Sequence, residues 1–301
     1  MSDTAKNALD GLAQAMLESV QPLIDARIEQ EIEAAKAKFG TRKIEVILPD
    51  GGSKKFEGHV HPVFDRVVKN IAAGFNVMLV GPAGCGKTHL AAQVAKALSY
   101  KFTAYSISEG TTESNFFGRL LPVGENGAFT YCTSPYVSFY EEGGLVLLDE
   151  MDRGNANVFT SLNASLAQDY FFSDLRSATG GKGFIKKHEA FRCIAAANTF
   201  GEGGSAMYAG ANQLDAATLT RFKVIEMDYD TAFEEKIAPE SVVNWVWDLR
   251  FKVKENQLRK VVGTRMIQQM ALGLQIGESW TEVKESALAG WSKDDRGRCK
   301  V

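Results

Sequence analysis

The residues best suited to chemistry form one short segment, Gly81-Pro82-Ala83-Gly84-Cys85-Gly86-Lys87-Thr88. This segment has the spacing G-x-x-x-x-G-K-[ST] of a phosphate-binding loop. Its glycines let the backbone wrap closely around an anion, so that successive N–H groups point at a β-phosphate. Lys87 is expected to reach the β- and γ-phosphates, and the Thr88 hydroxyl to ligate Mg²⁺. We expect Gly81 to His89 to contact the nucleotide.

Two carboxylates follow a second apolar run, Leu145-Val146-Leu147-Leu148-Asp149-Glu150. Such a run predicts a buried parallel strand that delivers its acids to the edge where ligands bind in open α/β sheets. Asp149 is suited to the Mg²⁺ shell and Glu150 to activating the attacking water. A strand that merely stops at a charged turn is the alternative, which the phosphate loop upstream disfavours.

A third run, residues 191–197, predicts another strand, and it ends at Asn198-Thr199. The Asn198 amide could hold the lytic water between Glu150 and the γ-phosphate. An asparagine at a strand end is more often a turn former, so the order of the motifs carries this interpretation.

That order continues into Leu219-Thr220-Arg221-Phe222, and the whole series resembles the AAA+ ATPases. More narrowly, it resembles their MoxR-type, dynein-related branch, which carries two inserted hairpins. The segments 117–130 and 170–188 each read as two short strands around a glycine-containing turn, at the two expected places. The expected fold is therefore an α/β P-loop NTPase core with a parallel sheet flanked by helices.

The resemblance implies roles that spacing alone does not. Asn198 becomes the sensor-1 residue, and Arg221 the arginine finger that completes a neighbouring subunit's site. Arg265, at the start of a predicted helix, resembles the sensor-2 position that contacts the γ-phosphate. Arg153 also matches a family position, with a less settled role. The family further implies ATP with Mg²⁺, a ring of hexameric size, and chaperone-like action on a protein client, often with a von Willebrand A-type partner.

Composition sets outer bounds on these interpretations. The 301 residues are 45% hydrophobic and carry a net charge of −3, which argues against a generally basic nucleic-acid surface. No membrane span or signal peptide is readable, so we expect a cytoplasmic protein. The four cysteines have no spacing typical of zinc sites or disulfides. Cys85 occupies a variable position of the loop, so its thiol is expected to be incidental; oxidation is a minor hypothesis, because a helix N-terminus lowers a thiol pKa.

The flanking regions complete a three-part organisation: an N-terminal helix over residues 1–40, a nucleotide-binding core over 41–229 and a helical lid over 230–301. The first helix would either pack on its own domain or serve in oligomerisation or partner docking. A small hairpin is expected from 43–48 and 54–56. In the lid, Thr231 to Glu234 and Ser279 to Glu282 have the shape of capping boxes. Its apolar faces are expected from Trp245, Leu249, Ile267, Met270 and Leu274.

The function predicted is that of a Mg²⁺-dependent ATPase ring that remodels a protein partner. A nucleic-acid motor or loader is the enzymatic alternative, which the aromatic run Tyr170-Phe171-Phe172 and the lysines after it keep open. A nucleotide-gated scaffold with little hydrolysis is the alternative of a different class. If the second hairpin enters a ring channel, Phe171 and Phe172 would contact the client; otherwise these rings would be core.

Overall fold

The computed structural model describes residues 42–47, 53–123, 127–204, 208 and 210–301. The helix predicted over residues 1–40 lies outside this part of the chain. Contacts assign the described residues to two units: residues 42–43 and 57–59 belong to the first, and the described residues of 44–56 and 60–301 belong to the second. Strands β1 (Arg42–Ile47) and β2 (Ser53–Gly58) pair into a two-stranded sheet, as the alternating sequence predicts.

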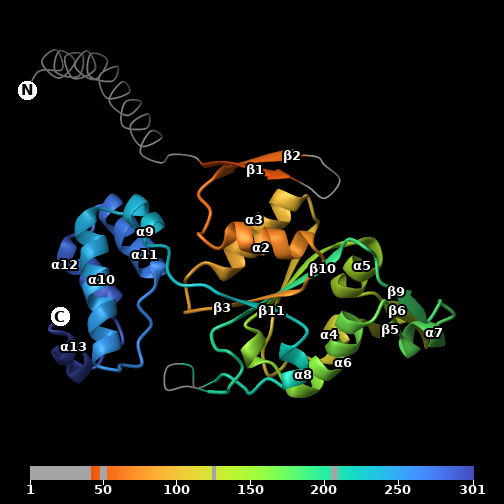
Figure 1. The fold of residues 1–301 in the computed structure, drawn as a ribbon. Helices are drawn as coiled ribbons and strands as arrows, with labels where there is room; N and C mark the ends of the chain where they lie inside the picture. Colours follow the sequence, from red (N-terminus) through yellow and green to blue (C-terminus); the bar gives the residue numbers. More distant parts are fainter. Residues whose placement is uncertain (1–41, 48–52, 124–126, 205–207, 209) are drawn as a thin grey trace, which may run out of the picture. The chain divides into compact units, whose positions relative to one another are not determined.

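The core of the second unit is a five-stranded sheet in which every pairing is parallel (Figure 1). Its strands, in the order in which they lie side by side, are β11 (Lys223–Glu226), β3 (Val77–Val80), β10 (Phe191–Ala197), β7 (Gly144–Asp149) and β4 (Phe102–Ser106). The register pairs Val80 with Ala197, Leu148 with Ala195, and Asp149 with Ser106. The loops that follow β3, β7 and β10 therefore leave the same edge of the sheet.

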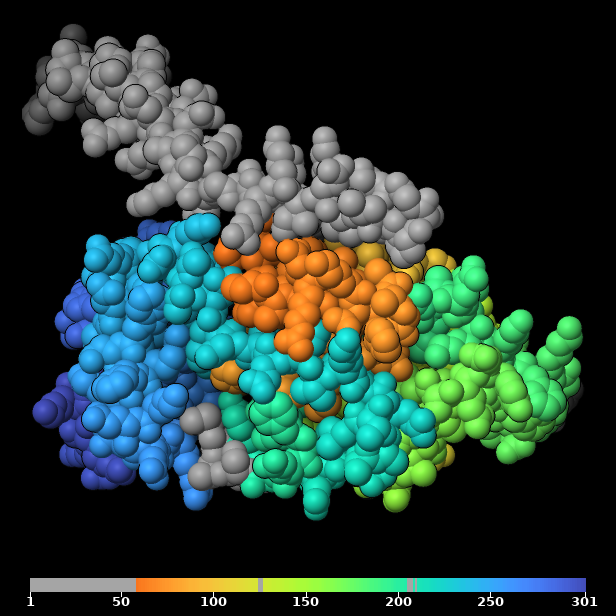
Figure 2. Space-filling model, in the orientation of Figure 1, coloured from red at the N-terminus to blue at the C-terminus, as the bar shows by residue number. Residues whose placement is uncertain are grey.

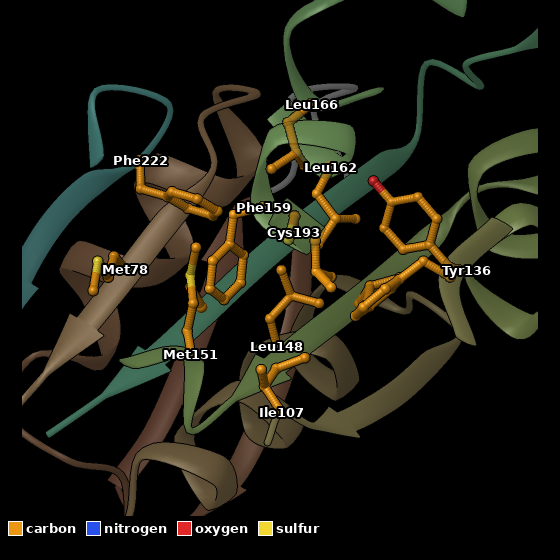
Figure 3. Packing of buried hydrophobic residues seen from close by; sticks show 14 of the residues in the cluster. Met78, Ile107, Tyr136, Leu148, Met151, Phe159, Leu162, Leu166, Cys193 and Phe222 are labelled. Carbon is orange, nitrogen blue, oxygen red and sulfur yellow. The ribbon is translucent and has the colours of Figure 1, made fainter. Parts of the chain in front are cut away.

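Alternate residues of these strands enter two hydrophobic clusters, one on each face of the sheet. The first cluster packs Leu79, Leu147 and Ile194 against α2 (Phe64–Ala72) and α3 (Lys87–Leu98). The second packs strand residues such as Met78, Leu148 and Cys193 against helices, as Figure 3 shows. Those helices are α4 (Glu113–Phe117), α5 (Pro135–Glu142) and α6 (Ala156–Ala167). Burial on both faces explains why these strands read as continuous apolar runs.

Both predicted hairpins are present. Strands β5 (Arg119–Val123) and β6 (Ala128–Cys132) pair antiparallel, and so do β8 (Tyr170–Phe172) and β9 (Phe184–Lys186). A short helix, α7 (Asp174–Ala178), lies inside the second hairpin and was not predicted. In this hairpin Phe171 is buried against Phe117 and Tyr140, so of the two alternatives for this ring the core position holds, whereas Phe172 is about half exposed.

The C-terminal region is all helical, as predicted. It contains α9 (Thr231–Ile237), α10 (Glu240–Glu255), α11 (Thr264–Gln275), α12 (Trp280–Ala287) and α13 (Lys293–Cys299), coloured cyan to blue in Figure 2. A hydrophobic cluster of its own holds these helices together, with Leu249, Ile267 and Met270 at its centre and Trp245 and Leu274 at its margin. We refer to residues 230–301 as the lid.

Of the two predicted capping boxes, the structure contains one. Ser279 and Glu282 form the reciprocal hydrogen bonds of a capping box at the start of α12. The box predicted from Thr231 to Glu234 is wrong. Asp230 caps α9 instead, since its carboxylate accepts from the Phe233 N–H at 3.0 Å. The buried Glu234 carboxylate does not cap α9 and instead forms an ion pair with Arg250.

Candidate functional site

The predicted phosphate loop connects β3 to α3 at the carboxyl edge of the sheet. Gly84 and Gly86 have φ values of 81° and 95°, which glycine adopts without strain. A side chain at Gly81 would overlap the carbonyl oxygen of Met227, so glycine is needed there for close approach. Helix α3 begins at Lys87 without a side-chain cap. Its first N–H groups therefore offer an anion site at a helix N-terminus, which suits a phosphate.

Lys87 lies at the centre of the loop and is almost completely buried. Its ammonium donates to the carbonyl oxygens of Gly81 and Pro82, at 2.7 and 3.0 Å, and to Asn198 Oδ1 at 2.9 Å. Burial lowers the pKa of Lys87, while Cys85 and the nearby carboxylates, Asp149 first among them, act in the opposite direction. The lysine thus joins the phosphate loop to the end of β10.

Thr88 and Asp149 supply the oxygen atoms expected for a divalent cation. The Thr88 hydroxyl donates to Asp149 Oδ2 at 2.6 Å, although the two residues are far apart in the sequence. A hydroxyl beside a carboxylate is a donor set that suits Mg²⁺, which prefers oxygen and retains several water ligands. These residues therefore fit the metal that an ATP-dependent site requires.

Glu150 follows Asp149 with a left-handed backbone, φ 54° and ψ 38°, an unusual conformation for a residue other than glycine. Its N–H donates to Asp149 Oδ1 at 3.0 Å, which fixes the turn. Its carboxylate pairs with Arg153 at 3.6 Å and is partly exposed. Such strain is concentrated at functional sites in proteins. The turn places Glu150 directly after Asp149, and the negative charge of Glu150 is among those that raise the pKa of Lys87 against the effect of burial.

Asp152 is a part of this site that sequence reasoning missed. It is 1% exposed, and its Oδ2 accepts from the N–H groups of Asn198 and Thr199 and from the Thr199 hydroxyl, at 3.0 to 3.1 Å. Oδ1 is buried with no hydrogen-bond partner among the described residues. Asp152 thus ties the turn that carries Glu150 to the end of the strand that carries Asn198.

Arg221 lies at the opposite edge of the sheet. It precedes β11, whose first residue Lys223 pairs with Val77, the first residue of β3. Gly81 is four residues beyond Val77, which corresponds to about 13 Å along the strands. The Arg221 side chain is exposed and has no hydrogen bond or ion pair with the described residues. It is therefore not brought together with the phosphate loop of its own chain.

Arg265 is the second residue of α11 and is also exposed. The start of its helix lies against the phosphate loop, because a Cβ on Gly263 would come within 2.9 Å of the Ala83 carbonyl oxygen. Two tyrosines that were not predicted also contact Ala83. The Tyr208 hydroxyl accepts from its N–H at 3.0 Å, and the Tyr229 hydroxyl donates to its carbonyl at 3.1 Å.

The surroundings of Cys85 favour the expectation of an incidental thiol over the minor hypothesis of oxidation. The thiol is buried within the loop, and this burial raises its pKa, which outweighs the lowering effect of Lys87. A raised pKa leaves little thiolate at neutral pH. Cys85 is therefore a packed part of the phosphate loop and lacks the environment of an oxidation-sensitive thiol.

Comparison with known families shows which proteins this arrangement resembles. Residues 76–222, from the start of β3 to the turn before β11, match the family described as AAA domain (dynein-related subfamily). Residues 76–222 are therefore similar to AAA domains of the dynein-related subfamily. The matched segment includes the phosphate loop, both carboxylates, Asn198 and Arg221, whereas the lid with Arg265 lies beyond it. The predicted P-loop NTPase fold is confirmed.

Individual relatives differ in how much of each protein is shared. Midasin of Dictyostelium discoideum is 28% identical over 167 residues, which is 54% of this chain and 3% of midasin. An uncharacterised protein of Staphylococcus saprophyticus is 24% identical, over 65% of this chain and 76% of that protein. The gas vesicle ATPase GvpN2 of Halobacterium salinarum is 26% identical, over 84% of this chain and 76% of GvpN2.

Among solved structures, a variant of RuvB from Thermotoga maritima is 16% identical, with a TM-score of 0.44. The match covers 78% of this chain and 69% of that one. Within the described residues, none of the helices is both long and apolar enough to cross a membrane.

Proposed function

We propose that this chain hydrolyses ATP with Mg²⁺, in rings of subunits that act on a protein partner. The observation that carries the proposal is the convergence of Lys87, Thr88, Asp149, Glu150 and Asn198 at one edge of the sheet. These side chains come from a loop and two further strand ends. Lys87 donates to Asn198 and Thr88 donates to Asp149, while the charges of Asp149 and Glu150 act on Lys87. A nucleotide-gated scaffold has no need of a positioned water activator, so the set favours hydrolysis.

Each side chain has a distinct task in this proposal. Lys87 and the uncapped start of α3 bind the β- and γ-phosphates. Thr88 and Asp149 hold the Mg²⁺, which when bound neutralises charge on the phosphate oxygens. Glu150 accepts a proton from the attacking water, and Asn198 orients that water by hydrogen bonding. Asp152 keeps the Glu150 turn and the Asn198 backbone at a fixed separation.

The position of Arg221 supports a site shared between neighbouring subunits. An exposed guanidinium at the far edge of the sheet is too distant to serve its own phosphate loop, but it can serve the site of an adjacent copy. Head-to-tail contacts of this kind close into rings when the rotation permits, and a hexamer is the size that we propose. The finger would stabilise charge on the transferred phosphoryl group. Arg265 is proposed to contact the γ-phosphate from the lid of the same chain.

The second hairpin provides the surface that we propose for the partner. Tyr170, Phe172 and Phe184 are about half exposed or more, and their rings contact one another on one face. Side chains on the opposite face, including Ile185, are buried in the core. A rigid apolar face on a buried support suits binding to a protein segment. The MoxR type, a chaperone role and a von Willebrand A-type partner remain parts of this proposal, as does action in the cytoplasm.

Lys186 shares the exposed face with these rings, so a nucleic-acid motor is the second candidate. Aromatic rings beside lysines can stack on bases and track a phosphate backbone. This candidate predicts ATP turnover that single-stranded DNA stimulates, with a steep decline as salt rises. Absence of stimulation at low salt would leave the protein partner as the proposal.

Two variants test the hydrolytic assignment. Glu150→Gln is expected to bind ATP and Mg²⁺ nearly normally while turnover falls at least about a hundredfold, because the water loses its base. Lys87→Ala is expected to lose nucleotide affinity instead. Isothermal titration calorimetry and phosphate release measure the two effects separately. Hydrolysis by Glu150→Gln at the normal rate would contradict the assignment.

A further inference from the structure

A series of side-chain contacts leads from the phosphate loop into the lid, and it begins at Ala83. The Tyr229 hydroxyl donates to the Ala83 carbonyl, while the Ala83 N–H donates to Tyr208, so both polar groups of this peptide are held by tyrosines. Tyr229 lies in the segment between β11 and α9. Burial raises its pKa, which keeps the hydroxyl protonated and able to donate.

The next contact is made by Arg250 of α10. Its guanidinium lies 3.8 Å from the centre of the Tyr229 ring, close enough for a cation–π interaction. The same guanidinium donates to both carboxylate oxygens of Glu234, at 2.7 and 3.1 Å, and to the Val262 carbonyl at 2.8 Å. With these partners fixed, Arg250 has one orientation, and the Tyr229 ring lies against it.

Glu234 connects this arginine to the start of α11. It is 0% exposed, and it also accepts from the Thr264 hydroxyl and from Trp247 Nε1, both at 2.7 Å. A buried carboxylate with all these donors permits little variation in geometry, because any lost bond leaves a buried charge unpaired. Thr264 is the first residue of α11, directly after Gly263, which packs on Ala83.

We infer that Tyr229, Arg250, Glu234 and Thr264 form a lid relay that couples the phosphate loop to the lid, with Tyr229 as its positioning residue at Ala83. The inference rests on the proposed nucleotide binding and deepens it. A displacement of the loop at Ala83 moves the Tyr229 ring, and through Arg250 and Glu234 it moves the start of α11. Binding at the loop is therefore transmitted to the lid through these four side chains.

The chain carries its own reporter for this relay. All four tryptophans lie in the lid, and Trp247 hydrogen-bonds to Glu234 itself. Addition of Mg²⁺-ADP to the full chain is expected to change the tryptophan emission, and Trp247→Phe is expected to remove that change. Tyr229→Phe deletes only the hydroxyl that contacts Ala83. It is expected to weaken ADP binding about two- to tenfold, the effect of one lost hydrogen bond, and to abolish most of the emission change.

Tyr140→Phe is the matched control, because its hydroxyl also donates to a backbone carbonyl, that of Gln168 at 2.8 Å, away from the relay. It is expected to leave affinity and emission unchanged. Gly263→Ala is a second test variant, since its added methyl would press on the Ala83 carbonyl; we expect it to reduce the emission change as well. Far-UV circular dichroism verifies that each variant is folded.

The outcomes separate this inference from the proposed function. If ADP binds and Lys87→Ala abolishes binding, but Tyr229→Phe and Gly263→Ala leave affinity and emission unchanged, the relay is refuted and the proposed function stands. If the unmodified chain binds no Mg²⁺-nucleotide, both are refuted. If ADP binds to the unmodified chain without changing its tryptophan emission, the relay is refuted and the proposed function stands.

Discussion

Replacement of Asp152 by alanine is expected to loosen the connection between the Glu150 turn and the Asn198 strand end. The variant leaves the N–H groups of Asn198 and Thr199, both in a partly buried region, without their carboxylate. An unsatisfied buried donor costs about 1 to 3 kcal/mol, so two give about 2 to 6 kcal/mol. The variant also removes the buried, unpartnered Oδ1 of Asp152, and this offsets part of the lost unfolding free energy. The expected loss of unfolding free energy is about 2 to 4 kcal/mol.

Thr199→Val provides a graded comparison, because it removes the hydroxyl donor and leaves both backbone donors in place. Its expected cost is about 1 kcal/mol. Asp174→Ala, at an exposed position in α7, is the control for removal of an aspartate and is expected to change stability by less than about 0.5 kcal/mol. Urea unfolding should be followed by far-UV circular dichroism, since tryptophan emission would report only the lid.

Catalysis provides the second measurement on Asp152. Displacement of Asn198 is expected to lower ATP turnover by more than tenfold at saturating Mg²⁺-ATP, well below the unfolding midpoint, because a small misplacement of a water-orienting group is costly. Nucleotide affinity should change much less. Unfolding of Asp152→Ala at the wild-type urea midpoint, together with wild-type turnover, would refute this reasoning.

Two further predictions concern burial. Phe171→Ala is expected to lower the free energy of unfolding by about 3 to 5 kcal/mol, because this ring is buried. The double variant Phe172→Ala with Phe184→Ala is expected to lower it by less than about 1.5 kcal/mol, because both rings are exposed. The double variant should lose partner-stimulated ATP turnover and keep basal turnover. Equal shifts of the urea midpoint would contradict the assignment of the two faces. Because burial raises its pKa, Cys85 is expected to alkylate more slowly at pH 7 than the half-buried Cys132, as mass spectrometry can measure. Faster alkylation of Cys85 than of Cys132 would contradict this prediction and would indicate that the phosphate loop opens to solvent.

Much of the core could be predicted because buried parallel strands leave a simple trace in sequence. Strands β3, β7 and β10 are covered on both faces and therefore appear as unbroken apolar runs. Strands β4 and β11 were not predicted, because they form the two edges of the sheet and are only partly buried. The order of the strands also could not be predicted, since it depends on packing between segments far apart in the chain.

In the site, motif spacing predicted residues that the structure brings together at one edge of the sheet, but not the residues that hold them in place. Asp152 follows Asp149 and Glu150 closely in the sequence, and nothing in the sequence indicates that Asp152 is the carboxylate that is buried. Tyr208 and Tyr229 approach Ala83 from distant segments. The capping box at Thr231 failed for a related reason, since Asp230 was an equally good cap one residue earlier and Glu234 had a buried partner in Arg250.

The roles of Arg221 and Lys87 in a shared site are tested most directly by mixing two inactive variants. Arg221→Ala should bind ATP and hydrolyse it poorly, because a lost finger costs about 10³- to 10⁵-fold in rate in related phosphoryl transfers. Lys87→Ala should fail to bind ATP. Mixed rings pair an intact phosphate loop from the first variant with an intact finger from the second, so the mixture is expected to regain turnover. A mixture that stays inactive, although sedimentation shows mixed rings, would contradict the shared-site account.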